Sequence, residues 1–73
     1  MGEQLIHDDE EATLIIGDNS ATLSWDRSIH SEKLMGLMKR ATPRPVQHLE
    51  HHPSHAPGRI TFTFHYETKK VIL

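Results

Sequence analysis

Hydrophobic and polar residues alternate in two neighbouring segments, 12–16 and 21–25, with the period of two that is typical of β-strands. The residues between them, 17–20, read Gly-Asp-Asn-Ser and favour a tight turn. A two-residue turn at 18–19 gives the cross-strand pairs Ile16 with Ala21, Leu14 with Leu23, and Ala12 with Trp25. These apolar side chains then share one side of a sheet, whereas a slip of one residue would scatter them. The sequence therefore predicts a hairpin over 12–25.

The apolar spacing changes to that of a helix in the next segment. The i, i+3, i+4, i+7 pattern of one buried stripe is formed by Leu34, Leu37, Met38 and Ala41. We expect Asp26 or Ser28 to cap the helix by accepting a hydrogen bond from a free backbone N–H. Thr42 ends it, because a residue before proline disfavours the helical conformation. The pattern predicts a helix over 28–41, in which Gly36 indicates a close packing contact.

A segment rich in proline and histidine follows the helix. Residues 43–58 contain all four prolines and four of the seven histidines. Sixteen residues are long for a structureless connection inside a compact domain. The sequence predicts a short helical turn from Pro45 through Leu49, followed by a mobile stretch.

The last segment alternates again, and 59–66 is predicted to be a strand. Its apolar face holds Ile60, Phe62, Phe64 and Tyr66. The apolar residues then change from even-numbered to odd-numbered positions, at Val71 and Leu73. A turn at 68–69 keeps them on one face by pairing Tyr66 with Val71 and Phe64 with Leu73, and a bulge in a longer strand is the alternative.

These elements predict a small single-domain α+β fold in the order β-β-α-β-β, an antiparallel sheet with one helix packed on one face. Residues 1–11 form an acidic, partly flexible N-terminal segment, and 12–73 form the domain. A chain of 73 residues has one small core, which rarely supplies more than about 3–5 kcal/mol. The absence of cysteine excludes disulfides and thiolate zinc sites. A second copy would supply further buried area, so we expect a homodimer.

Charge is divided unequally along the chain. The net charge is −2, but residues 1–26 hold seven acidic residues and no Lys or Arg, whereas 27–73 hold all eight basic residues and three acidic ones. Such asymmetry indicates a charged partner or a self-complementary surface. We expect a non-enzymatic regulatory or inhibitory adaptor, a role often filled by small proteins of phages and other mobile elements. Its expected contacts with a basic protein partner are Asp8, Asp9, Glu10, Glu11 and Asp18.

The alternative is a nucleic-acid-binding regulator that uses the basic half of the chain. Its expected phosphate contacts are Lys39, Arg40, Arg59, Lys69 and Lys70. The aromatic residues of the 59–66 strand resemble a base-stacking platform in spacing, but they occupy the face that the core needs. The isoelectric point near 6.4 also argues against a polyanionic partner.

Four histidines lie close together in the sequence, namely His48, His51, His52 and His55. On a continuous helix they would lie near one face and offer imidazole nitrogens to zinc, copper or nickel. Pro53 interrupts such a helix. A solvated loop is therefore the favoured interpretation, and no metal site or cofactor is assigned.

Catalysis and membrane insertion have less support. His65 projects from the polar side of its predicted strand and is a conceivable general acid–base residue, with Lys69 or Arg59 holding a phosphate. No second catalytic signature accompanies it, so no enzymatic activity is expected. The first residues lack the pattern of a secretory signal, and no run approaches the roughly 20 apolar residues that span a bilayer. We expect a cytoplasmic protein without a membrane partner.

Overall fold

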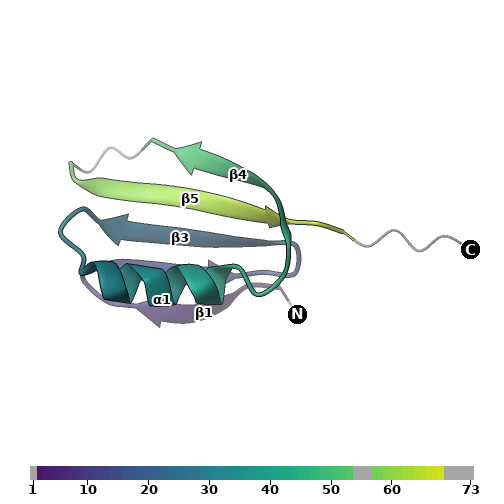
Figure 1. Cartoon of the computed structure of the whole chain (residues 1–73), viewed down its shortest axis with the longest axis horizontal. Coiled ribbons are helices and arrows are strands. Elements are labelled where there is room, and N and C mark those ends of the chain that lie inside the picture. The colour runs from purple at the N-terminus through teal and green to yellow at the C-terminus, as the bar shows by residue number, and fades with distance from the viewer. Residues whose placement is uncertain (1, 54–56, 69–73) are drawn as a thin grey trace, which may run out of the picture.

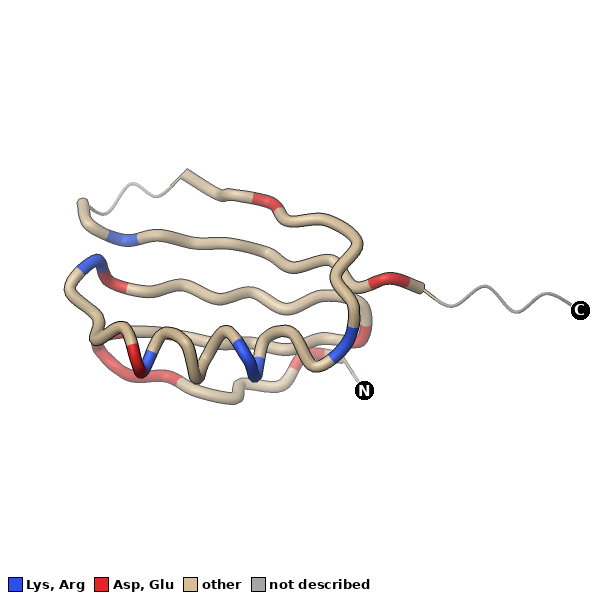
Figure 2. Tube along the Cα trace, viewed as in Figure 1, with Lys and Arg blue, Asp and Glu red and all other residues tan. Residues whose placement is uncertain are grey.

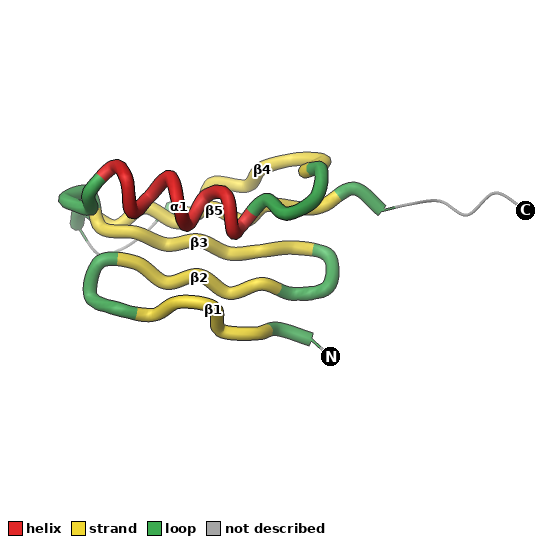
Figure 3. The backbone as a smooth tube through the Cα atoms, turned by 60° about the horizontal axis from the view of Figure 1, so that its bottom comes forward, coloured by secondary structure: helices red, strands yellow, loops and turns green. Residues whose placement is uncertain are grey.

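The computed structural model describes residues 2–53 and 57–68. Within these residues the chain forms one five-stranded antiparallel sheet and one helix, and the sheet order is β1-β2-β3-β5-β4 (Figure 1). The elements are β1 (Gln4–Asp8), β2 (Ala12–Ile16), β3 (Ser20–Asp26), α1 (Ser31–Ala41), β4 (Val46–His52) and β5 (Arg59–Tyr66). The helix lies over one face of the sheet (Figure 3). The predicted α+β class is thus confirmed, with two strands more than the sequence indicated before residue 68.

The β2–β3 hairpin has the predicted register. Ile16 lies opposite Ala21, Leu14 opposite Leu23, and Ala12 opposite Trp25. The Gly17 N–H donates to the Ser20 carbonyl at 2.7 Å, which closes the two-residue turn at 18–19. Local turn chemistry and apolar alternation specify the same pairing, and the apolar side chains face the helix.

Strand β5 is also confirmed, and it lies between β3 and β4. At Phe64 one edge of β5 pairs with Ala21 and the other with Leu49. The predicted return strand to Leu73 lies outside the described residues.

The segment after the helix forms a strand, so the predicted helical turn from Pro45 through Leu49 is wrong. Of the mobile stretch predicted after it, residues 50–52 belong to the strand, and 54–56 lie outside the described residues. Val46–His52 pairs antiparallel with β5 and has a bulge between Val46 and His48. Only two of these seven residues are apolar, so the alternation that marks β2 and β5 is hidden in β4. Proline stands on either side of the strand, at Pro45 and Pro53, where it interrupts no ladder hydrogen bond.

Strand β1 comes from the acidic N-terminal segment. Gln4–Asp8 pairs with β2, so the sheet begins before the domain boundary predicted at residue 12. The Asp9 carboxylate builds the β1–β2 turn by accepting hydrogen bonds from the backbone N–H groups of Glu11 and Ala12, at 2.8 and 2.9 Å. A bulge between Leu5 and His7 shifts the register.

The helix begins later than predicted. Neither expected cap caps it, since His30 holds that position without a side-chain hydrogen bond. The Asp26 carboxylate instead accepts hydrogen bonds from the backbone N–H and hydroxyl of Ser28, at 2.9 and 2.7 Å, in the turn after β3. The Ser28 donors lower the pKa of Asp26 below its usual value. Gly36 is exposed and a Cβ there would meet nothing within 4 Å, so the predicted packing contact is wrong.

The core lies between α1 and the β2–β3 half of the sheet. Its buried residues are Ala12, Leu14, Ala21, Leu23, Trp25, Leu37, Ala41, Phe64 and Tyr66. Leu34 and Met38 pack against this cluster, which confirms the predicted helix stripe. Towards β4 the same face is less well covered: Phe62 stacks on Trp25 at 5.5 Å but is only partly buried, and Leu49 is 51% exposed.

The second face of the sheet is polar over β3, β4 and β5, and it carries Leu5 and Ile15 on β1 and β2. No helix in 2–53 or 57–68 covers it (Figure 3). Cross-strand pairs place threonine, serine, histidine and glutamate on this face, which we call the open face. No helix among the described elements has the length and apolar character needed to cross a membrane.

Candidate functional site

The open face carries a cluster of ionisable side chains where β4 meets β5. His48 lies directly opposite His65, and Glu50 follows His48 by two residues on the same strand. Because alternate residues of a strand project to the same face, the three side chains meet on the open face. We call them the His–Glu cluster.

The geometry of the His–Glu cluster is close. The rings of His48 and His65 stack with their centroids 4.2 Å apart and their planes 13° apart. Glu50 Oε2 lies 2.7 Å from His65 Nε2. One donor atom from each of the three residues lies within 4.8 Å of the other two. His52, two residues beyond Glu50, forms a 2.8 Å hydrogen bond with Thr63 Oγ1.

Electrostatics keep the carboxylate of this cluster ionised. The hydrogen bond with His65 lowers the pKa of Glu50, and the neighbouring charges of His65, His52 and His48 lower it further. The cluster therefore presents one carboxylate and two imidazoles, all partly open to solvent. These donors can bind a cation or exchange protons with a ligand.

Spacing in the sequence alone indicates a different group of histidines. On a strand, His51 projects to the helix side, where its ring lies 5.0 Å from that of Phe62, while His48 and His52 project to the open face. His55 lies outside the described residues. The solvated loop favoured for these histidines is thus wrong for the three that the structure describes, which lie on β4, and His65 joins the cluster. The grouping of His65 with His48 and Glu50 depends on the pairing of β4 with β5, which was not predicted from the sequence.

Some of the predicted acidic contact residues already form bonds within the chain. Lys33 Nζ lies 2.5 Å from Asp9 Oδ2 and 3.2 Å from Glu11 Oε1, so α1 is tied to the β1–β2 turn. Asp8 accepts a hydrogen bond from the Thr13 hydroxyl at 3.1 Å. Glu10 and Asp18 are exposed, at the β1–β2 and β2–β3 turns respectively. The five residues therefore lie at two turns, and two of them are paired with Lys33.

The contact between Asp9 and Lys33 predicts a dependence of stability on pH. The Lys33 ammonium holds the pKa of Asp9 well below its usual range, with help from the backbone N–H groups of Ala12 and Glu11 and from His7. A carboxylate with a depressed pKa in the folded state stabilises that state above its unfolded-state pKa, about 4, and this stabilisation is lost as the pH falls further. We expect Asp9→Asn to flatten the fall in stability below about pH 4.

Urea unfolding at a series of pH values checks this, with Glu10→Gln as the control. That substitution removes an adjacent exposed carboxyl that has no bond to Lys33 among the described contacts. If the free energy of unfolding falls equally steeply below about pH 4 in wild type and in Asp9→Asn, the prediction is wrong.

The three predicted phosphate contacts that the structure describes do not lie on one face. Lys39 and Arg40 lie in the last turn of α1, on the helix side. Arg59 lies on the open face, where its Nε donates to Ser24 Oγ at 2.9 Å. Lys69 and Lys70 lie outside the described residues. Figure 2 shows the basic positions spread over the helix, the loops and β5, an arrangement that does not follow a single nucleic-acid strand.

Of the conceivable acid–base site, Lys69 lies outside the described residues, and the other two residues lie far apart. His65 and Arg59 stand near opposite ends of β5, and at 3.3–3.4 Å per residue their six-residue separation is about 20 Å. A phosphate held by Arg59 would therefore not reach the imidazole of His65.

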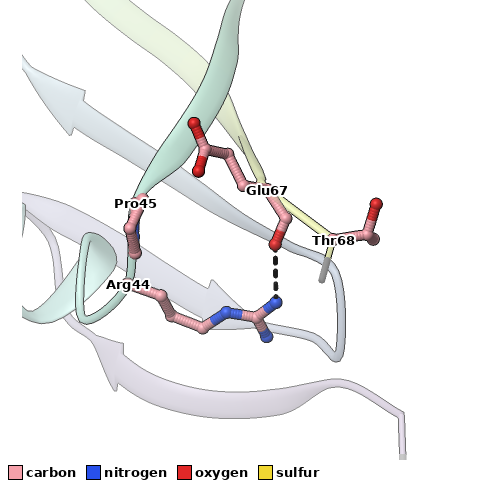
Figure 4. A pocket seen from close by; sticks show the side chains of 4 residues that line it. All are labelled: Arg44, Pro45, Glu67 and Thr68. Carbon is pink, nitrogen blue, oxygen red and sulfur yellow. Dashed lines mark hydrogen bonds between the residues drawn. The ribbon is translucent and has the colours of Figure 1, made fainter. Parts of the chain in front are cut away.

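A hollow of about 340 Å³ lies at the end of β5, lined by Arg44, Pro45, Glu67 and Thr68 (Figure 4). The Arg44 guanidinium donates to the carbonyls of Asp18 and Glu67, at 2.9 and 3.2 Å, and lies over the ring of Tyr66. Arg44 thus ties the α1–β4 connection to the β2–β3 turn and the end of β5. These contacts give Arg44 a structural role beside the hollow.

The fold and the open face together define a small α+β domain with a half-covered sheet and a cluster of histidines at one side. The chain matches no protein-family model, no curated protein sequence and no solved structure. Inference about its function therefore rests on its own residues.

Proposed function

We propose that this chain is a non-enzymatic protein-binding module that forms a homodimer by pairing β4 with the β4 strand of a second copy. The observation that carries the proposal is the position of β4, the outermost strand of the described sheet next to β5. An outermost strand exposes a row of unpaired N–H and C=O groups that can add a further strand.

Strand β4 has few of the features that protect a sheet edge, apart from the bulge between Val46 and His48 and the charge of Glu50. Val46–His52 contains no lysine, arginine or proline, and Glu50 is its single formally charged residue. Leu49 is 51% exposed at its centre, next to the part of the helix-side face that α1 covers poorly. A strand of a second copy would bring a further apolar side chain against Leu49.

The sequence of β4 is self-complementary in an antiparallel pair. A twofold axis through Leu49 places each Leu49 opposite its copy on the helix side. The same register places each His48 opposite the Glu50 of the second copy, on the open face. Opposite-charge and hydrogen-bonding pairs across strands stabilise a sheet, so this register is supported on both faces.

The proposed adaptor role rests on exposed acidic residues at two turns. Glu10 and Asp18 are exposed, and a dimer would present each of them twice to a basic surface of a regulated protein. The dispersed positions of Lys39, Arg40 and Arg59 give the nucleic-acid alternative less support.

A charge placed on the proposed interface tests the dimer. We expect wild type to sediment as a dimer and Leu49→Lys to sediment as a monomer, because an inward-pointing lysine opposes edge-to-edge pairing. Met35→Lys is the matched control: Met35 is 62% exposed, but it lies on α1 away from β4. That variant should remain a dimer.

Analytical ultracentrifugation over a range of protein concentrations provides the measurement. A wild type that is monomeric at every concentration, or a Leu49→Lys variant that dimerises like wild type, would refute the proposed interface. Retention on heparin that is lost steeply with added salt would instead favour the nucleic-acid alternative.

A further inference from the structure

We propose that His48, Glu50 and His65 form a binding site for a divalent first-row transition metal ion, with Zn²⁺ as the probe. This inference concerns the side chains on the open face, and it does not depend on pairing of the β4 edge.

The donor set suits such an ion. Two imidazole nitrogens and one carboxylate oxygen are ligands of zinc, and imidazole also suits copper and nickel, whereas Mg²⁺ and Ca²⁺ prefer oxygen alone. Three protein ligands leave one position of a tetrahedral ion open. On the exposed face of the sheet, water or a donor group of another molecule would take that position.

The distances require only side-chain adjustment. Metal–ligand bonds of about 2.0–2.2 Å place two donors on one tetrahedral ion roughly 3.3–3.5 Å apart. The donor atoms of the three residues already lie within 4.8 Å of one another. Rotation about the side-chain bonds, which also separates the stacked rings of His48 and His65, would close the difference.

The backbone holds the three residues in fixed relative positions. Two ligands lie two residues apart on β4, and the third lies directly across on β5. The β4–β5 pairing extends from Val46 opposite Tyr66 to His52 opposite Thr61, so the cluster sits within the paired length. A site built on paired strands is positioned more firmly than one on a loop.

Two of the three ligands, Glu50 and His65, are joined by a hydrogen bond. Glu50 Oε2 and His65 Nε2 share a proton across 2.7 Å, which turns this nitrogen towards the cluster. On binding, the Nε2 lone pair goes to the metal ion. The shared proton then moves to Nδ1, or leaves to solvent if the ring is imidazolium, so binding weakens in acid.

Calorimetric titration with ZnCl₂ near neutral pH tests the site. We expect one ion per chain in wild type. Loss of an outer-shell partner commonly lowers metal affinity by about 10–100-fold, and loss of a direct ligand should cost at least as much in His65→Gln and in Glu50→Gln. Glu50 is exposed, so Glu50→Gln should fold normally even if His65→Gln does not.

His51→Gln is the matched control, because His51 lies on the same strand but projects to the other face. It should bind zinc like wild type. Amide chemical-shift changes on zinc addition should centre on residues 48–50 and 64–66. Leu49→Lys should keep one ion per chain, which separates failure of the dimer from failure of the metal site.

Two results would overturn the site. One is weak binding of several ions without saturation, as expected of a histidine-rich tract. The other is an equal affinity in Glu50→Gln, His65→Gln and wild type.

Discussion

Replacement of Leu23 by alanine should leave little folded protein under conditions in which wild type is folded. Leu23 is fully buried, at 0% exposure, between Leu14 of β2 and Phe62 of β5. Truncating a buried leucine costs about 3 kcal/mol, within a range of 2–5. A domain of this size rarely has more than about 3–5 kcal/mol in total. Urea unfolding followed by the fluorescence of Trp25 measures the loss.

Leu5→Ala is the control for this truncation. Leu5 is 61% exposed on β1, so the same change of side chain should alter stability by less than about 0.5 kcal/mol. If the proposed dimer forms, unfolding of either variant should depend on protein concentration. Equal losses at Leu23 and Leu5 would mean that the core does not lie between α1 and β3.

Tyr66→Phe should produce the second large loss, about 1–2 kcal/mol. The Tyr66 hydroxyl donates to the carbonyl of Ala41, the last residue of α1, at 2.6 Å. Burial raises the pKa of Tyr66, which keeps the phenol protonated as a donor. Phenylalanine keeps the ring in the core but leaves the buried carbonyl without this partner.

The hydroxyl of Thr42 offers a matched comparison at the same end of the helix. It donates to the carbonyl of Met38 at 2.8 Å, but the contact is exposed and water can replace it. Thr42→Val should therefore change the free energy of unfolding by less than about 0.5 kcal/mol. A loss in Thr42→Val as large as that in Tyr66→Phe would show that burial does not set the cost.

The sequence predicted those elements whose pattern is complete within a few residues. The 12–25 hairpin and the 59–66 strand alternate clearly because one face of each packs in the core. Strand β4 was missed because, at the outermost position, it needs few apolar residues. Its pairing partner, β5, decides its conformation. The helix cap was misplaced because Asp26 accepts hydrogen bonds from Ser28, within the turn itself.

The candidate site was harder to predict than the fold. Its two halves, at 48–50 and 65, are brought together only by the register of β4 on β5. Histidine spacing alone favoured a grouping with His51, which the strand places on the opposite face. No local pattern in the sequence links His65 with Glu50.

The position of β5 inside the sheet, between β3 and β4, has a consequence for synthesis of the chain on the ribosome. This strand comes last among the described elements, yet it separates β3 from β4 and pairs with both (Figure 1). Until Arg59–Tyr66 has left the exit tunnel, the nascent polypeptide has a free β3 edge beside Leu23 and Trp25. Such an unfinished sheet is prone to aggregation. The sheet is therefore expected to be completed only after β5 has emerged, and chaperones would protect the growing chain until then.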